Sequence, residues 1–273
     1  MVASLRGVGR LSEGARDFLL TLCEDARRRV SEGYYRIERK ETIFHGERLS
    51  TSILRQKGNA VIAEFKRASP SMGAIVGGAS PRESVRAMER GGACGISVLT
   101  AREWFEGSIE DLIEARMACS LPILMKDVVV SEEQIEAAHR LGAQAVLLIL
   151  RAFNRGYTQV SLERAIRLAR DLSLEVLLEA CSREELLEAL GTDADMVGVN
   201  SRDLSTLRVD KMVHVRAVEG LDVGGRVLIA ESGIDSAEDI RRLRGLGYRA
   251  FLIGTSIMKG PDVESKTREL VRA

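Results

Sequence analysis

Residues 122–149 read PILMKDVVVSEEQIEAAHRLGAQAVLLI, and this stretch contains one complete unit of the repeat that decides the fold. Two short apolar runs at its ends, 122–126 and 145–149, have the length of strands buried on both faces of a parallel sheet. The charged, amphipathic segment 131–141 lies between them, and Ser131 with Gln134 resembles a capping box that begins a helix. Gly142 stands where a C′ glycine would end that helix. The stretch therefore predicts a strand, a helix and a second strand.

The same rhythm continues from about residue 60 to the end of the chain. Ser182 and Ser236 begin two more predicted helices, and Gly191 and Gly247 stand where C′ glycines would end them. The predicted strands are 60–66, 95–100, 122–126, 145–149, 174–179, 196–200, 226–231 and 250–253. Eight strand–helix units in about 210 residues are what a (β/α)8 barrel requires.

A doubly wound open sheet is the rival architecture. Such a sheet usually has roughly five or six strands and a glycine-rich first turn of the form G-x-G-x-x-G. The first turn here reads KRASPSMG (66–73) and lacks that pattern. We therefore predict an α/β chain that folds as a single (β/α)8 TIM barrel.

The first 57 residues lie outside the repeat. We predict that residues 1–57 form an N-terminal extension, helical over 18–30, that packs on a catalytic barrel of residues 58–273. Arg27, Arg28 and Arg29, near the end of the predicted helix, are expected to form a solvated face. No Pro/Gly-rich linker divides the chain, so one barrel domain is expected.

Composition and charge argue against several classes of protein. Forty Lys and Arg balance forty Asp and Glu, and a net charge of zero does not favour binding to nucleic acid or to a membrane surface. The longest apolar run, 145–150, is well below the roughly 20 residues that span a bilayer, and no apolar segment near the N-terminus resembles a secretory signal. Four cysteines and three histidines show no metal-ligand spacing. These features predict a cytoplasmic protein with reduced thiols, no metal and no cofactor.

Polar side chains gather at the ends of the predicted strands. Alternate strand residues point into the lumen of a barrel, and the C-terminal strand ends form its active face. In VIAEFK (61–66), Ala63 and Phe65 suit the helix layer, so the charged residues beside them are expected to point inward. The same alternation groups Leu228, Ala230 and Ser232 on the inner face of the seventh strand. The polar residues predicted at this face are Glu64, Lys66, Lys126, Glu179, Asn200 and Ser232, with Arg202 just beyond. A structural ion pair would explain the inward polar residues of one strand. Polar residues at the ends of five strands indicate an active site.

Two kinds of chemistry suit lysines beside carboxylates. A lysine in the lumen could act as a general acid, or its amine could form a Schiff base with a ketone substrate. The residue pattern leaves both roles open. Because no carboxylate cluster has metal-ligand spacing, metal-free acid–base chemistry is favoured.

A phosphate site is predicted after the last two strands. Barrels often bind phosphate there through backbone N–H groups, and this chain reads ESGI (231–234) and IGTS (253–256) at those places. Gly233 and Gly254 would let the backbone approach a ligand closely, with Thr255 and Ser69 as hydroxyl donors. These paired motifs predict a phosphorylated small-molecule substrate.

Long motifs in this chain resemble the indole-3-glycerol phosphate synthase family of the tryptophan pathway. The matching stretches run in order from about residue 60 to 260: IAEFKRASPSMG (62–73), SVLTAREWFEGSIEDL (97–112), PILMKDVVVSEEQIEAA (122–138), GAQAVLLI (142–149), VGVNSRDLSTL (197–207), ESGI (231–234) and AFLIGTSIM (250–258). The resemblance implies a cofactor-free carboxy-lyase. Its substrate, 1-(2-carboxyphenylamino)-1-deoxyribulose 5-phosphate, would lose carbon dioxide and water as an indole ring closes.

The resemblance also implies roles for single residues. Lys126 matches the family lysine that protonates the ketone, while Glu179, Lys66 and Glu64 match the network that serves dehydration. Asn200 is counted with these catalytic residues and matches a position that holds a hydroxyl of the substrate, while Arg202 and Ser232 match substrate contacts. The phosphate site would be formed by Ser69, Gly233, Gly254 and Thr255, and the pocket for the anthranilate ring by Leu99, Phe105, Leu147 and Leu204.

Two other functions are compatible with a phosphate-binding barrel. A related phosphate-binding barrel, such as phosphoribosylanthranilate isomerase, would be expected to use an Asp/Cys pair at its strand ends, where Lys126 and Glu179 stand here. A non-catalytic barrel that binds a phosphorylated ligand would be indicated by loss of either residue, and both are present. Contacts with other enzymes of the tryptophan pathway are left open.

Overall fold

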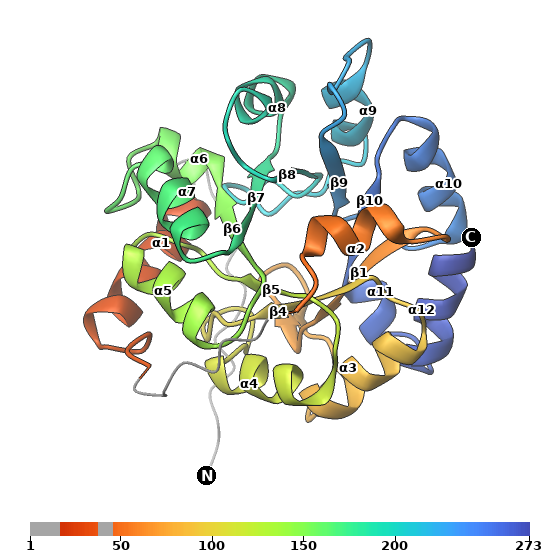
Figure 1. Ribbon diagram of the computed structural model, residues 1–273, viewed down its shortest axis with the longest axis horizontal. Coiled ribbons are helices and arrows are strands. Elements are labelled where there is room, and N and C mark those ends of the chain that lie inside the picture. The colour runs from red at the N-terminus through yellow and green to blue at the C-terminus, as the bar shows by residue number, and fades with distance from the viewer. Residues whose placement is uncertain (1–16, 38–45) are drawn as a thin grey trace.

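The computed structural model describes residues 17–37 and 46–273, and within them eight parallel strands close into a barrel (Figure 1). The strands are β1 (Ala60–Phe65), β4 (Gly95–Leu99), β5 (Ile123–Lys126), β6 (Ala145–Ile149), β7 (Glu175–Ala180), β8 (Met196–Asn200), β9 (Val227–Glu231) and β10 (Ala250–Ile253). Each strand pairs with the next, and β1 pairs with both β4 and β10, which closes the ring. The predicted TIM barrel is therefore confirmed.

Helices surround the barrel (Figure 1). They are α3 (Pro81–Arg90), α4 (Ile109–Ala118), α5 (Glu132–Arg140), α6 (Leu150–Asn154), α7 (Leu162–Asp171), α8 (Arg183–Leu190), α9 (Val213–Val218), α10 (Ala237–Gly245), α11 (Thr255–Met258) and α12 (Val263–Arg272). A small hairpin of β2 (Ala68–Ser69) and β3 (Gly73–Ala74) follows β1. None of the described helices is long and apolar enough to cross a membrane.

The helix signals predicted from the sequence are confirmed with one exception. Ser131 and Ser236 both form complete capping boxes at the starts of α5 and α10. Gly142 and Gly247 have φ angles of 78° and 96°, which is the left-handed conformation of a C′ glycine. The prediction for Gly191 was wrong: it is itself the C-cap of α8, with a right-handed φ of −79°. The last turn closes there without a left-handed residue.

The strand register brings the C-terminal strand ends to one rim of the barrel. Leu99 of β4 pairs with Lys126 of β5, Ile149 of β6 pairs with Glu179 of β7, and Asn200 of β8 pairs with Glu231 of β9. Because all the strands are parallel, the polar residues at their ends meet at the same rim.

Two helices precede the barrel and lie at its opposite ends. Helix α2 (Leu49–Arg55) is at the N-terminal ends of the strands, where the Ser52 hydroxyl donates to the Cys94 carbonyl oxygen at 2.6 Å. Helix α1 (Phe18–Ser31) is at the C-terminal rim, where the Arg29 guanidinium contacts Asp127, the residue after β5. Residues 1–16 and 38–45 of the predicted extension lie outside the described residues.

The expected solvated face of α1 is wrong for one of its three arginines. The Arg28 side chain is 52% exposed, but Arg29 is only 3% exposed. Arg29 is buried because it forms ion pairs with Asp127 and Glu103, which local sequence pattern cannot reveal.

Candidate active site

A pocket with about 970 Å³ of empty space, part of it open to solvent, lies at the C-terminal ends of the strands. Its lining includes every site residue predicted from the sequence: Glu64, Lys66, Ser69, Leu99, Phe105, Lys126, Leu147, Glu179, Asn200, Arg202, Leu204, Ser232, Gly233, Gly254 and Thr255. The structure therefore brings together residues that are spread over nearly 200 positions of the chain. Further lining residues, among them Leu22, Asp127 and Glu231, were not predicted.

Lys126 lies between two buried carboxylates. Its Nζ is 2.8 Å from Glu231 Oε2 and 3.6 Å from Glu179 Oε2. Burial opposes the charge on Lys126, but the carboxylates of Glu231 and Glu179 outweigh it and hold the pKa of this lysine well above its usual range. Burial, together with the nearby charge of Glu231, raises the pKa of Glu179 to about 7. The pocket thus places a protonated amine beside a carboxyl group that titrates near neutral pH.

A second ion pair lies at the end of β1. The Lys66 Nζ is 2.8 Å from Glu64 Oε1, while Glu64 Oε2 is buried and has no hydrogen-bond partner among the described residues. Burial disfavours the ionised form of Glu64, but the positive charges of Lys66 and Lys126 prevail and lower its pKa. Glu64 is therefore a buried carboxylate whose ionised form is favoured at the end of β1.

Two glycines make room for the buried carboxylates. A Cβ atom added at Gly198, in β8, would lie 2.1 Å from Glu231 Oε1. One added at Gly254, just after β10, would lie 2.6 Å from Glu64 Oε1 and 3.1 Å from Lys66 Cε. Neighbouring strands therefore supply the space into which the charged side chains of β9 and β1 extend.

Glu231 is the functional candidate that sequence reasoning missed. The alternation counted back from Ser232 placed Leu228 and Ala230 on the inner face, but Glu231 points into the pocket and contacts Lys126. Strand β9 ends at Glu231, and Ser232 follows with a left-handed φ of 63°, so strand alternation does not extend to it. A charged residue at the end of an otherwise apolar strand was the signal that could have identified Glu231.

Backbone and hydroxyl groups form the side of the pocket predicted to bind phosphate. Ser232 and Gly233 are consecutive left-handed residues, with φ angles of 63° and 66°. Gly254 precedes the short helix α11, which begins at Thr255. The Ser69 hydroxyl is buried and has no hydrogen-bond partner among the described residues. This side can offer N–H and O–H donors to an anion.

Arg202 lies between the ion pairs and the hairpin after β1. Its backbone N–H donates to Asn200 Oδ1 at 2.9 Å, and its guanidinium donates to the Ser71 hydroxyl at 2.6 Å. One strand end thus carries both an amide and a cation in the pocket.

The opposite wall of the pocket is apolar. Leu99, Phe105, Leu147 and Leu204, the four residues predicted to pack an aromatic ring, are joined there by Leu22, Val128 and Ile149. An apolar wall opposite a few convergent polar groups is typical of a small-molecule site. Among the residues 17–37 and 46–273, no group of three or more His, Cys, Asp or Glu side chains is arranged to hold a metal ion.

Comparisons with known proteins agree with this geometry. The family model described as indole-3-glycerol phosphate synthase matches residues 23–270. Indole-3-glycerol phosphate synthase of Desulfosudis oleivorans is 41% identical over 79% of this chain and 80% of its own length, and that of Sulfurisphaera tokodaii is 43% identical over 78% and 82%. A solved structure of thiamine phosphate pyrophosphorylase from Pyrococcus furiosus has a TM-score of 0.57 at 23% identity, covers 80% of this chain and 95% of its own, and shares the fold alone. The chain belongs to the indole-3-glycerol phosphate synthase family.

Proposed function

We propose that this chain closes the indole ring of 1-(2-carboxyphenylamino)-1-deoxyribulose 5-phosphate with general acid–base chemistry from its own side chains. A ring carbon attacks the ketone carbon, the carboxylate leaves as carbon dioxide, and a hydroxyl group then leaves as water. One observation carries the proposal: the Lys126 Nζ lies 2.8 Å from Glu231 Oε2, in a pocket that has both an apolar wall and hydrogen-bond donors for a phosphate.

Lys126 acts as the acid in the first step. As the ring carbon attacks, electrons move onto the ketone oxygen, and the protonated amine of Lys126 supplies a proton to it. A Schiff base would require the neutral amine, but the neighbouring carboxylates of Glu231 and Glu179 favour the charged form. Of the two roles left open by the sequence, the acid is the one that this geometry supports.

Dehydration is served by the remaining charged groups. The hydroxyl left by the attack must take a proton to depart as water, and a carbon-bound proton must be removed. Lys66, paired with Glu64, is a proton donor for the hydroxyl, and Glu179, whose pKa is raised to about 7, is a proton acceptor near neutral pH. Glu231 orients Lys126 through their contact.

The other pocket residues hold the substrate. Asn200, Arg202 and Ser232 bind its hydroxyl and anionic groups, and the phosphate lies against Ser69, Gly233, Gly254 and Thr255. The planar anthranilate ring packs against Leu99, Phe105, Leu147 and Leu204.

Further features belong to the same proposal. The described part of the N-terminal extension, residues 17–37 and 46–57, packs on the catalytic barrel of residues 58–273, and the protein works in the cytoplasm without contacts to nucleic acid or membranes. The four free cysteines, three of them buried, support a reducing compartment.

Turnover by the purified protein, without added metal or nucleotide, tests the function. Conversion of the anilino-deoxyribulose phosphate to the indole product should appear as a change in fluorescence. Lys126→Ala should lower kcat by roughly 10²–10⁴-fold, because a general acid contributes that much. Lys126→Arg should not restore kcat, since arginine does not readily release its proton.

Lys57→Ala is the matched control, because Lys57 is exposed and precedes β1 at the other end of the barrel. It should leave kcat unchanged. Substrate binding without turnover would instead support a non-catalytic phosphate-binding barrel, and an unchanged kcat in Lys126→Ala would remove this lysine from the mechanism.

A further inference from the structure

The residue that follows Lys126 is held by four hydrogen-bond donors. Asp127 Oδ1 accepts from the Arg29 guanidinium at 2.9 Å and from the Val128 backbone N–H at 2.7 Å. Its Oδ2 accepts from the Tyr35 hydroxyl at 2.7 Å and from the Thr100 hydroxyl at 2.6 Å. Asp127 is only 3% exposed, so this carboxylate is satisfied entirely by groups of the protein.

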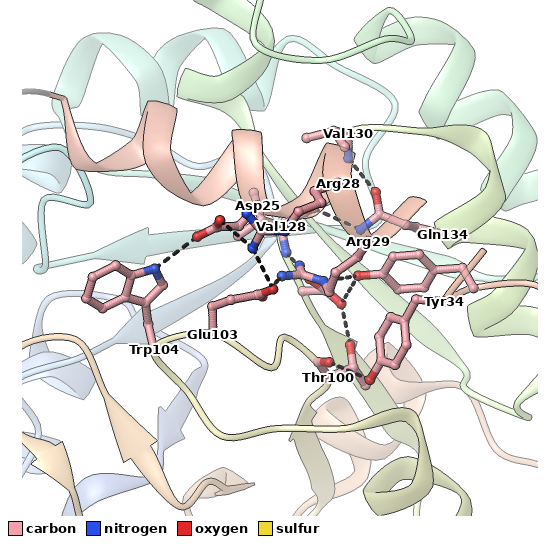
Figure 2. A network of polar contacts seen from close by, with 12 residues as sticks. Asp25, Arg28, Arg29, Tyr34, Thr100, Glu103, Trp104, Val128, Val130 and Gln134 are labelled. Carbon is pink, nitrogen blue, oxygen red and sulfur yellow. Dashed lines mark hydrogen bonds and ion pairs between the residues drawn. The ribbon is translucent and has the colours of Figure 1, made fainter. Parts of the chain in front are cut away.

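Arg29 connects this carboxylate to the loop that follows β4. Figure 2 shows the network around Arg29, whose guanidinium also pairs with Glu103 and donates to the Tyr35 hydroxyl at 3.0 Å. Glu103 lies two residues before Phe105, which lines the apolar wall of the pocket. A single side chain of α1 therefore reaches both the end of β5 and the loop that carries Phe105.

Thr100 joins the same network to the backbone of Lys126. The Thr100 N–H donates to the Lys126 carbonyl oxygen at 3.2 Å, and its hydroxyl donates to Asp127. The Thr100 carbonyl oxygen in turn accepts from the Tyr34 hydroxyl at 3.1 Å. Strand β5 ends at Lys126, so beyond this point the backbone is fixed by the Asp127 carboxylate and its donors rather than by the strand ladder.

We propose that Arg29 is a positioning residue for the reaction: it acts through Asp127 to fix the Lys126 backbone, and its pair with Glu103 holds the guanidinium in place. The inference rests on the proposed role of Lys126. A buried ion pair is weak evidence for a gain in stability, because desolvation of both charges offsets their attraction. What favours positioning here is that two segments distant in sequence, residues 29–35 and Thr100, converge on the residue beside Lys126, and that the Lys126 Nζ must stay close to both carboxylates.

Arg29→Gln removes the charge and retains a polar side chain. It should lower kcat by roughly 10–100-fold with KM changed less than about threefold, because displacement of the acid by about 1 Å is costly to the reaction. Arg28→Gln is the matched control: Arg28 is adjacent, pairs with the same Glu103 at 3.0 Å, is 52% exposed and does not contact Asp127. Its kcat should stay within about twofold of the unsubstituted protein.

A double substitution separates positioning from a loss of structure. If Arg29 acts through Lys126, then Arg29→Gln should lower kcat by less than about threefold when Lys126 is already alanine. The same fall in kcat in both backgrounds, or a kcat for Arg29→Gln within twofold of the unsubstituted protein, would overturn the inference. The kcat of Lys126→Ala alone tests the proposed function. Failure of the proposed function can therefore be distinguished from failure of the inference about Arg29.

Docking of α1 can be followed in the same samples. Trp104 is the only tryptophan of the chain, and its indole N–H donates to Asp25 of α1 at 3.1 Å. Its fluorescence emission should be unchanged in Arg29→Gln. A red shift of the emission would indicate that α1 has undocked in Arg29→Gln. In that case the kcat of Tyr35→Phe, which lacks one hydrogen-bond donor to Asp127, tests the inference. That variant should lower kcat by about three- to tenfold at unchanged KM, and an unchanged kcat would overturn the inference.

Discussion

Gly198→Ala adds one methyl group to β8 at the point where the Glu231 carboxylate lies. The new Cβ would be 2.1 Å from Glu231 Oε1, whereas ordinary contacts of a Cβ atom begin at 3.4 Å. The carboxylate would therefore have to move by about 1.3 Å, the difference between these distances. The contact between Glu231 Oε2 and the Lys126 Nζ is 2.8 Å long, and such a movement is enough to break it.

The expected effect falls on catalysis rather than on substrate binding. A displacement of about 1 Å in a catalytic site lowers the rate by roughly 100-fold, which corresponds to about 2.7 kcal/mol of activation free energy. The proposed phosphate loop and ring wall do not include Gly198, so KM should change by less than about threefold. Steady-state kinetics with purified protein would measure both constants.

Gly95→Ala is the control for a buried strand glycine. Its Cβ would lie 2.5 Å from Leu49 Cδ1 at the other end of the barrel, so overpacking should lower the free energy of unfolding by roughly 1–3 kcal/mol without changing kcat. Thermal unfolding would measure that loss in both variants. A kcat for Gly198→Ala within about threefold of the unsubstituted protein would refute the positioning of Lys126 by Glu231.

Two further predictions concern protonation and the phosphate loop. The kcat of the unsubstituted protein should rise with pH around 7, because Glu179 must lose its proton to act as a base and its pKa is raised to about 7. In Glu231→Gln the rise in kcat should occur at lower pH, because the substitution removes a negative charge that helps to raise the pKa of Glu179. A pH–rate profile in which the rise stays at the same pH or moves to higher pH would contradict the reasoning. Gly233→Ala should raise KM by about tenfold with kcat little changed, because a side chain is strained at a φ of 66° and the new Cβ would press on Ser201 Oγ at 3.0 Å. Gly225→Ala, at a φ of 78° with nothing within 4 Å, carries the same strain away from the pocket and should leave KM unchanged in the same assay.

The barrel could be predicted because its strands are buried on both faces and therefore read as continuous apolar runs. The runs at 145–149 and 196–200 coincide with β6 and β8. Lys126 and Glu179 were predictable because each is a charged residue at the end of an apolar run. Burying such a charge costs free energy unless the charge is paired or contacts a ligand.

The remaining contacts could not be predicted, because they depend on distant parts of the chain or on local backbone geometry. Arg29 and Asp127 are 98 positions apart, and the pattern of α1 alone places three adjacent arginines on its surface. The alternation counted back from Ser232 pointed away from Glu231, because the left-handed φ of Ser232 interrupts that alternation and no residue letter announces such a conformation; the charge of Glu231 at the end of an apolar strand was its one signal.

Two buried carboxylate oxygens of the pocket, Glu64 Oε2 and Glu231 Oε1, have no hydrogen-bond partner among the residues that the structure describes, and they set a limit on how stable this barrel can be. Each unsatisfied buried acceptor costs about 1–3 kcal/mol, and replacing a whole buried charge cluster by apolar side chains often stabilises a protein. Selection for thermal resistance alone would therefore remove these charges and leave a sturdier but inactive barrel. Stabilising substitutions that preserve turnover should be sought in the helices and at the N-terminal strand ends, away from the C-terminal rim.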